Sequence, residues 1–481
     1  MTAFLISLAV LIGGYIIYGG AVDRIMGTDR NRKMPAYTKR DDVDYRPMKP
    51  WRVFLIQFLN IAGLGPIFGA IMGIMFGPAA FLWIALGTIF AGAVHDFCSG
   101  VISIRMDGAS LPEIVGSQLG NGVRRLMGVF SVLLLILVAA VFVLTPAGLL
   151  AAMTPDALTT GFWIVAIFAY YILATLLPID KLIGNLYPLF GGALLFMAIG
   201  ILGVLLFGDV SIPVSFNDGF ESHSASGSPV MPMMFVSIAC GAISGFHATQ
   251  SPMMARCLTN EKLARPIFYG AMVAEGIVAL IWAAAAVAFT GGYEQLAEYM
   301  ASGNTAGSLV HDISFGWLGT FGGILAVLGV VAAPITTGDT ALRSARLTLA
   351  DFLRFNQSAL WRRLVVAVPL FALTAAVMMI DFQILWRYFA WCNQTLAVFT
   401  LWAVTVYLSR YGKYLYVISL VPAMFMTAVC TSYLLCAPQP EGFGLDVKLA
   451  GMIAAGVSSV LCVLFSVFKP DSLNGLQTTR S

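Results

Sequence analysis

The chain has 481 residues, of which 59% are hydrophobic and 11% are charged, and its formal net charge is +3. Soluble domains contain about 25% charged residues, so this composition excludes an ordinary soluble protein, and so small a net charge indicates no particular partner. A hydrocarbon core about 30 Å thick is crossed by roughly 20 apolar residues in a helix, and segments of that length recur along the chain. We therefore expect an all-α polytopic membrane protein with a single membrane domain over residues 1–481.

The first apolar segment, residues 3–22, lacks the basic start and the small-residue cleavage site of a signal peptide. We interpret residues 1–22 as an extra N-terminal helix that is retained. Further apolar segments follow, each near the spanning length, which predicts about thirteen transmembrane helices. These segments cover residues 53–76, 78–104, 126–150, 161–178, 186–208, 230–255, 266–290, 317–342, 364–380, 384–408, 414–436 and 447–468.

Lysine and arginine are concentrated in every second connection between these segments. With thirteen alternating helices, all but two of the 27 lysines and arginines fall on one side, the exceptions being Arg387 and Lys448. Positive charge marks the cytoplasmic loops of membrane proteins. We therefore predict that the N-terminus lies outside and the C-terminus in the cytoplasm.

The stretch "NIAGLGPIFGAIMGIMFG", residues 60–77, is an unusually weak membrane helix, because glycine recurs at every fourth position and a proline interrupts the run. Backbone groups freed by glycine and proline must find partners in the protein or in a water-filled cavity. We predict that the helix breaks here and that residues Gly63, Gly65, Pro66 and Ile67 form part of a site for an anionic solute, held by backbone N–H groups at the start of the half-helix near Pro66 and Ile67. The alternative is that the glycines serve only close helix packing.

A second interrupted segment, "SIACGAISGFHATQSPMMAR", follows five helices later and runs in the opposite direction. This arrangement is typical of a five-plus-five inverted repeat with a substrate site at the midplane. The repeats would cover residues 53–208 and 230–408, followed by two extra C-terminal helices at 414–468. The halves share no detectable sequence identity, so this prediction rests on topology.

Four ionisable side chains lie inside predicted spans, where such groups are costly and indicate function. His95 and Asp96 belong to the third segment, His247 to the seventh and Glu275 to the middle of the eighth. A carboxyl group as deep as Glu275 suits a coupling proton. A structural, hydrogen-bonded acid is the alternative.

Thr336, Thr337 and Asp339 cluster at the end of the ninth segment, after Pro334. Hydroxyl and carboxylate oxygens suit a small cation or a proton relay. The alternative for Asp339 is an ion pair with Arg343, one helical turn further on.

Asn393 and Gln394 lie inside the eleventh segment. Amides in membrane helices either bind neighbouring helices or line a substrate path, and both interpretations stay open.

The candidate residues divide into a substrate-binding and an ion-coupling group. The seven cysteines contribute no site, because they show neither a CxxC motif nor metal-ligand spacing. We predict no metal and no cofactor apart from a coupling ion, H+ or Na+. The predicted substrate-binding residues are Gly63, Gly65, Pro66, Ile67, Ser244, His247, Thr249, Gln250, Asn393 and Gln394. The predicted ion-coupling residues are His95, Asp96, Glu275, Thr336, Thr337 and Asp339.

Several long motifs in order, among them "GPIFGAIMGIMFG", "FAGAVHDFCSGVISIRMDGASLPE", "ISGFHATQSPMMAR", "TTGDTALRSARL" and "NQTLA", resemble the carbon starvation protein A (CstA) family. The resemblance spans almost the whole chain, which looks like a short member. It implies uptake of peptides or pyruvate across the bacterial inner membrane during nutrient limitation, in some members with protons. It also implies a LeuT-type core, whose discontinuous first and sixth helices would contain Gly63 and Ser244, and whose cation site would lie near Thr336.

We therefore predict secondary active uptake of a small carboxylate such as pyruvate by ion-coupled symport, with di- or tripeptide transport as the alternative. The expected partners are a small-molecule substrate and the lipid bilayer, not nucleic acid, and the sequence predicts no oligomeric state. A passive channel and an intramembrane metal enzyme are weaker alternatives, because neither a filter ring nor an HExxH motif is present. The chain also lacks a Walker A motif, which argues against ATP-driven pumping, and we predict a transporter and not an enzyme.

Overall fold

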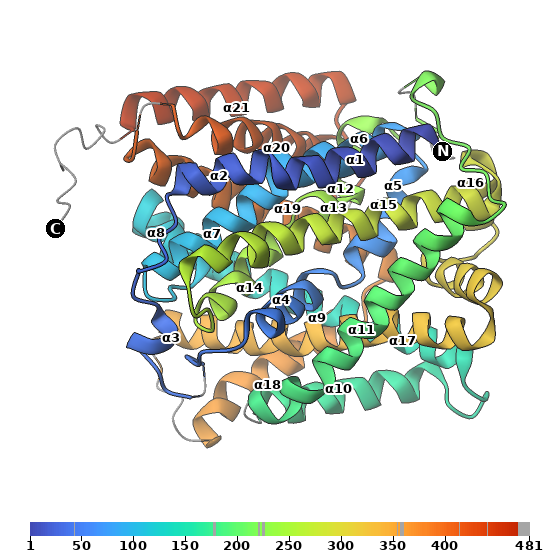
Figure 1. Ribbon diagram of the computed structural model, residues 1–481, viewed down its shortest axis with the longest axis horizontal. Helices are drawn as coiled ribbons and strands as arrows, with labels where there is room; N and C mark the ends of the chain where they lie inside the picture. Colours follow the sequence, from blue (N-terminus) through green and yellow to red (C-terminus); the bar gives the residue numbers. More distant parts are fainter. Residues whose placement is uncertain are drawn as a thin grey trace.

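The computed structural model describes residues 1–469 apart from 43, 177–178, 220–221, 224–226, 354, 356–359, 413 and 440. The described residues form helices and connections and contain no strand, which confirms the all-α prediction. Most of the long helices run along the long axis of the molecule (Figure 1). The N-terminus and α16 (Tyr293–Ala301) lie at one end of this bundle, and α3 (Pro35–Thr38) and α8 (Leu111–Leu119) lie at the other.

Nine helices among the described residues are long and apolar enough to cross a membrane, or ten when one bent pair counts as a span. A multi-pass helical protein is thereby confirmed, whereas the number thirteen stays a prediction. Three expected spans fall outside the ten, at residues 161–178, 230–255 and 364–380. The helix Thr160–Leu176 is short, and residues 230–255 are divided into several short helices.

The described residues of the first half form eleven α-helices and two π-helical segments, η1 and η2. They are α1 (Thr2–Ile16), α2 (Tyr18–Met26), α3, α4 (Pro50–Ile61), η1 (Gly65–Gly69), α5 (Ala70–Ile74), α6 (Ala79–Leu82), η2 (Trp83–Gly92), α7 (Ala93–Arg105), α8, α9 (Asn121–Met153), α10 (Thr160–Leu176) and α11 (Ile179–Phe207).

The second half begins with a series of short elements and continues with long helices. They are η3 (Phe216–Asp218), η4 (Val230–Met234), α12 (Phe235–Ser237), α13 (Ala239–Ala242), α14 (Gly245–Ala255), η5 (Glu261–Leu263), η6 (Arg265–Tyr269), α15 (Gly270–Thr290), α16, α17 (Ala306–Leu353), α18 (Leu360–Val377), α19 (Phe382–Ser409), α20 (Val417–Cys436) and α21 (Val447–Phe468).

Local sequence explains where several of these helices begin or bend. Proline occupies the first turn of α4, where its missing N–H costs no hydrogen bond. Ser110 and Glu113 form a reciprocal capping box at the start of α8. The long helix α17 is kinked at Gly319, whose φ of 65° and ψ of −176° are open only to glycine.

The second predicted span is broken as expected. Helix α4 ends at Ile61, and the helical segment that follows, Gly65–Ile74, is bent by 52° from it. The backbone leaves helical geometry at Ala62 (φ −81°, ψ 49°). The break therefore lies immediately before Pro66, inside the glycine-rich stretch.

The other interrupted span is broken between α13 and α14, where Ile243 and Ser244 are extended. The two breaks pack against each other: Gly65 abuts the side chain of Cys240, and Gly73 abuts Ile238. A Cβ atom at Gly69 would lie 2.7 Å from the carbonyl oxygen of Ser237. The glycines thus serve both a helix break and close packing between the two interrupted spans.

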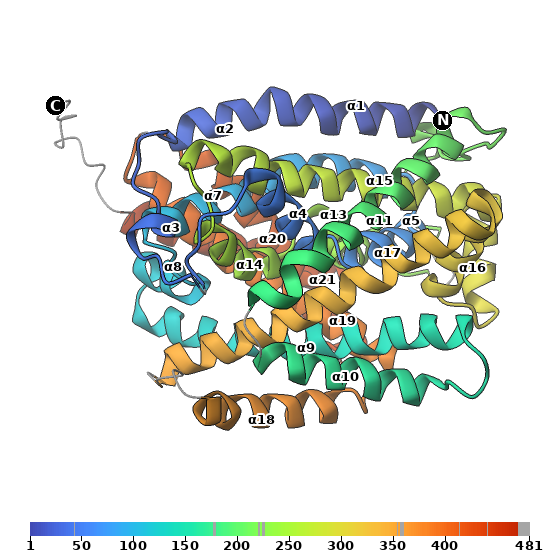
Figure 2. The same ribbon diagram turned by 60° about the horizontal axis from the view of Figure 1, so that its bottom comes forward.

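Helix α14 lies in the interior of the bundle, with α1 on one side and α18 on the other (Figure 2). It packs against α4, α7 and α19. An interrupted helix leaves backbone N–H and C=O groups without partners in the helix, and these groups need partners in the protein. An interior position provides such partners.

Candidate functional site

Four buried ionisable residues meet where α7, α14 and α15 come together. Nδ1 of His95 lies 2.7 Å from Oδ1 of Asp96, and Nδ1 of His247 lies 2.9 Å from Oδ2 of the same carboxylate. Nε2 of His247 faces Glu275, at 3.4 Å from Oε2. All four side chains are fully buried. We call this set the His–Asp array.

The His–Asp array joins residues that the sequence places far apart, since Asp96 and His247 are separated by 151 positions. Buried charges are tolerated only when they are paired. Two acids and two imidazoles in contact can balance their charges in more than one protonation state, so the array is chemically suited to take up and release a proton. The sequence predicts His247 as a substrate-binding residue; the structure places it between Asp96 and Glu275, and its contact with a substrate stays a prediction.

Asn393 of α19 holds the start of α14. Its Oδ1 accepts hydrogen bonds from Ser244 Oγ at 2.9 Å and from the backbone N–H of Phe246 at 2.7 Å. The first N–H groups of a helix have no partner within the helix, so this amide satisfies one of them. The neighbouring Gln394 donates to the carbonyl oxygen of Phe235, on the other side of the break.

The threonine pair of α17 lies against the break in the second span. The one hydroxyl hydrogen of Thr337 has two acceptors within reach, the carbonyl oxygens of Ala333 at 2.8 Å and Leu59 at 3.1 Å from Oγ1, and Thr336 Oγ1 donates to Ala333 at 2.8 Å. These hydroxyl and carbonyl oxygens are ligands of the kind that hard cations prefer.

Asp339 has a different environment from the threonines. It is fully buried, and its nearest ion-pair partner among the described residues is Arg343, one turn further on, at 4.0 Å. This geometry agrees with the alternative of an ion pair within one helix.

The backbone at the first break is partly engaged in this conformation. The N–H groups of Ile67 and Phe68 donate to the carbonyl oxygen of Leu64, at 3.1 and 2.8 Å. Gly63 lies against the ring of Phe142 and the hydroxyl of Thr337. An anion at Ile67 would therefore have to replace an existing hydrogen bond.

Two polar residues of this region were missing from the sequence-based candidates. Gln57 and Asn60 of α4 are fully buried, and none of their side-chain nitrogen and oxygen atoms has a hydrogen-bond partner among the described residues. The sequence does contain a pattern that points to them: both are amides inside an apolar span, and a separation of three residues places them next to each other on one helical face.

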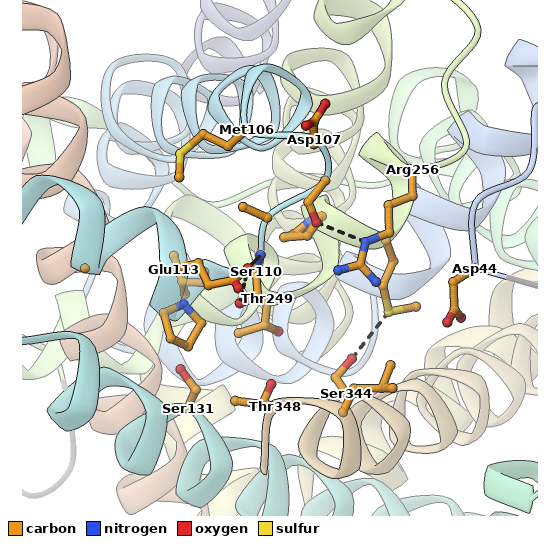
Figure 3. A pocket seen from close by; sticks show the side chains of 18 of the residues that line it. Asp44, Met106, Asp107, Ser110, Glu113, Ser131, Thr249, Arg256, Ser344 and Thr348 are labelled. Carbon is orange, nitrogen blue, oxygen red and sulfur yellow. Dashed lines mark hydrogen bonds between the residues drawn. The ribbon is translucent and has the colours of Figure 1, made fainter. Parts of the chain in front are cut away.

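A cavity of about 950 Å³ opens at the end of the bundle that carries α3 and α8. Figure 3 shows side chains from several helices arranged around it. We call this cavity the vestibule; its hydroxyl-bearing lining residues are Tyr45, Ser110, Ser117, Ser131, Thr249, Ser344 and Thr348. The charged groups around it include Arg256, whose Nε donates to the carbonyl oxygen of Gly108 at 3.0 Å.

Thr249 connects the vestibule to the interior. Its hydroxyl donates to the carbonyl oxygen of Phe246 at 2.6 Å and accepts from Nε2 of Gln250 at 3.0 Å. Gln250 itself is fully buried. The vestibule thus reaches the helix that carries His247.

Comparison with known proteins identifies the family. The family model described as carbon starvation protein CstA matches residues 1–162 and 152–317. The chain belongs to this family. This CstA family member is 41% identical over 355 residues to a Haemophilus influenzae protein described as an uncharacterized membrane protein, an alignment that covers 63% of the chain and 95% of the relative.

Two relatives have names that describe transport. The peptide transporter CstA of Campylobacter jejuni is 29% identical over 342 residues, and the pyruvate/proton symporter BtsT of Escherichia coli is 28% identical over 338 residues. Both alignments cover 57% of the CstA family member but only 48% and 47% of the relatives. The matched region is therefore about half the length of either transporter.

A solved structure shares the fold. The manganese transporter of Eremococcus coleocola superposes with a TM-score of 0.54 over 89% of this chain and 97% of that chain, at 12% sequence identity. The resemblance concerns the fold alone.

Proposed function

We propose that this CstA family member is a secondary transporter of the bacterial inner membrane that couples proton entry to the uptake of a small carboxylate-bearing solute. The observation that carries the proposal is the His–Asp array. It places two acids and two imidazoles without solvent contact beside an interrupted helix, where a change in protonation and a change in helix position can influence each other.

The arrangement of the interrupted helices supports alternating access. We propose that residues 53–208 and 230–408 form inverted repeats of a LeuT-type core, with residues 1–22 and 414–468 outside it. The two breaks pack against each other at Gly65 and Cys240, as expected when a solute site lies at the interface of two repeats.

The orientation follows from the positive charges. The end of the bundle that carries α3 and α8 includes the strongly basic connection at residues 22–51. We place this end in the cytoplasm and the N-terminus outside. The vestibule is then the cytoplasmic exit of the transport path.

Pyruvate and di- or tripeptides are the two candidate solutes. Both carry a carboxylate, and each is supported by the name of a relative, the pyruvate/proton symporter BtsT in one case and the peptide transporter CstA in the other. Transport, and not catalysis, is the activity we propose.

Uptake into proteoliposomes tests the proposal. Purified full-length protein would be reconstituted, and accumulation of labelled pyruvate and labelled L-alanyl-L-alanine would be measured with an imposed proton gradient or an imposed sodium gradient. We expect accumulation of at least one solute with the proton gradient and its loss when a protonophore is added.

Two other results would contradict proton coupling. Accumulation only with the sodium gradient would assign the coupling ion to the oxygens around Thr336 and Thr337. Ion conductance without solute accumulation would indicate a passive channel.

A further inference from the structure

Three buried amides near the first break have unsatisfied hydrogen-bonding atoms. Gln57 and Asn60 of α4 and Gln250 of α14 are all fully buried. Both polar atoms of Gln57, both of Asn60 and the Oε1 atom of Gln250 have no hydrogen-bond partner within the described part of the chain. Buried polar atoms are almost always hydrogen-bonded, so five such atoms on two adjacent helices require an explanation.

The contacts of α4 show which way its two amides point. Leu55 and Leu59 lie against Gly191 of α11. At 3.6 residues per turn, Gln57 and Asn60 point about 180° and about 120° away from that contact. The other elements that α4 packs against are α14, α15, α17 and η6, and we infer that both amides point toward these elements.

The contacts of α14 indicate that Gln250 points toward α4, the helix that carries Gln57 and Asn60. Met253 receives a hydrogen bond from Ser344 of α17, and His247 faces α7 and α15. By helical periodicity, Gln250 lies about 60° from each of these residues, between them. Since α4 packs against α14, α15 and α17, it is the helix that faces this position.

Leaving these atoms without partners destabilises the protein. A buried amide without a hydrogen bond has lost its bonds to water and gained none in the protein. Apolar residues at the same positions would avoid this cost. A bound solute that supplies the missing partners is a direct physical reason for polar residues here.

The chemistry of the missing partners indicates the kind of solute. Three of the five atoms are amide oxygens, which only accept hydrogen bonds, and both carboxylate oxygens of Glu275 on α15 also lack a hydrogen bond among the described residues. A keto acid anion offers acceptors only. It would satisfy the amide N–H groups and leave the oxygens unpaired.

We propose that Gln57, Asn60 and Gln250 form a binding site for a solute that carries amino or amide N–H groups in addition to a carboxylate. The N–H groups of the solute donate to the amide oxygens, and the amide nitrogens of Gln57 and Asn60 donate to its carbonyl or carboxylate oxygens. This inference rests on the proposed transport function and specifies its solute. Gln250 hydrogen-bonds to Thr249 of the vestibule, which gives the bound solute a route toward the α3 and α8 end.

The test uses the apolar variants Gln57→Met, Asn60→Leu and Gln250→Met of the full chain in proteoliposomes. We expect KM for L-alanyl-L-alanine to rise about tenfold in each variant, because one or more hydrogen bonds to the solute are lost. We also expect the thermal unfolding temperature in detergent to stay unchanged or rise, because an unpaired buried amide has been removed. Residues with only a structural role would not combine weaker solute binding with undiminished stability.

Thr405→Val is the matched control. Thr405 is buried on α19, and its hydroxyl already has partners in Leu401 and Ser419. We expect this variant to retain the KM of the wild type.

Two outcomes would contradict the inference but not the proposed function. One is transport by the wild type with unchanged KM in all three amide variants. The other is transport of pyruvate without any competition from L-alanyl-L-alanine. Absence of gradient-driven uptake by the wild type would instead contradict the proposed function itself.

Discussion

The Oδ1 atom of Asn393 accepts the backbone N–H of Phe246 at 2.7 Å, so that a side chain of α19 caps α14, 147 positions earlier in the chain. The same oxygen also accepts the hydroxyl of Ser244. The two donors belong to the break in the seventh predicted span. The position of α14, and with it the position of His247, therefore depends on an amide from a distant helix.

Replacing Asn393 by alanine should lower stability. The substitution leaves the N–H of Phe246 and the hydroxyl of Ser244 without their acceptor inside the protein, which should cost about 1–3 kcal/mol in the free energy of unfolding. Ser244→Ala is the matched comparison, because it removes one donor and leaves the bond to Phe246 intact. Thermal unfolding in detergent should show a clearly larger decrease for Asn393→Ala, and equal decreases would disprove a capping role.

Replacing Asp96 by asparagine should uncouple transport from the proton gradient. Asp96 is the residue that contacts both histidines of the array, and its neutral amide can no longer change charge with them. We expect loss of gradient-driven accumulation, while exchange of labelled for unlabelled solute persists. Asp209→Asn, at an exposed position outside the helices, is the control. Normal gradient-driven accumulation by Asp96→Asn would remove the array from the coupling mechanism.

Enlarging Gly65 should block transport through a clash with a single identified neighbour. A Cβ atom at this position would overlap the side chain of Cys240, so Gly65→Leu and Gly65→Ala should both abolish uptake. The double variant Gly65→Ala with Cys240→Gly removes the clash and should recover part of the uptake. Membrane insertion should be the same for all of these variants, as measured by the yield of folded protein.

A glycine with free space around it provides the control for Gly65. A Cβ atom at Gly13 of α1 would meet nothing within 4 Å, so Gly13→Ala should transport like the wild type. If Gly65→Ala also transported normally, the packing between the two interrupted spans would not limit function.

Removing the carboxylate of Glu261 should loosen the N-terminal helices. Glu261 is fully buried and accepts hydrogen bonds from Arg32 Nε at 2.9 Å, Arg105 Nε at 2.8 Å and the N–H of Asp29 at 2.6 Å. Glu261→Ala leaves these donors unpaired and should cost about 1–3 kcal/mol. We expect a lower unfolding temperature and faster proteolysis after residues 30–33.

An exposed ion pair serves as the comparison for Glu261. Lys39 and Asp107 lie 3.6 Å apart with largely exposed side chains, and such pairs contribute little because water screens them. Lys39→Ala, which removes this pair, should leave both the unfolding temperature and the proteolysis rate unchanged. An equal effect of the two substitutions would show that burial of Glu261 is not what makes it important.

Sequence reasoning located most of the polar residues in the candidate site but not their partners. His95, Asp96, His247 and Glu275 were visible because an ionisable residue contrasts with an apolar segment. Their mutual contacts were not visible. The assignment of His247 to the substrate followed from its place in the interrupted span, whereas its distance of 2.9 Å from Asp96 depends on how α7 and α14 pack.

The two amides absent from the sequence-based candidates show that sequence also does not reveal which polar residues lack a partner. Gln57 and Asn60 are absent from the sequence-based candidates, although Asn393 and Gln394, which are also amides inside a span, are among them. That Gln57 and Asn60 lack any such partner among the described residues emerged only from the packed structure. The oxygen of Asn393 does bind a neighbouring helix, and its contact with a substrate stays a prediction.

The sequence by itself determined the features that depend on composition and local order: a multi-pass all-helical protein of the CstA family, and breaks next to Pro66 and Ser244. These follow from length, hydropathy, glycine and proline, which act within a few residues. Only the tertiary structure decided that His95, Asp96, His247 and Glu275 form one array and that the two breaks pack at Gly65 and Cys240. The physical reason is that contacts between distant segments depend on helix packing and rotation, and no local pattern specifies these.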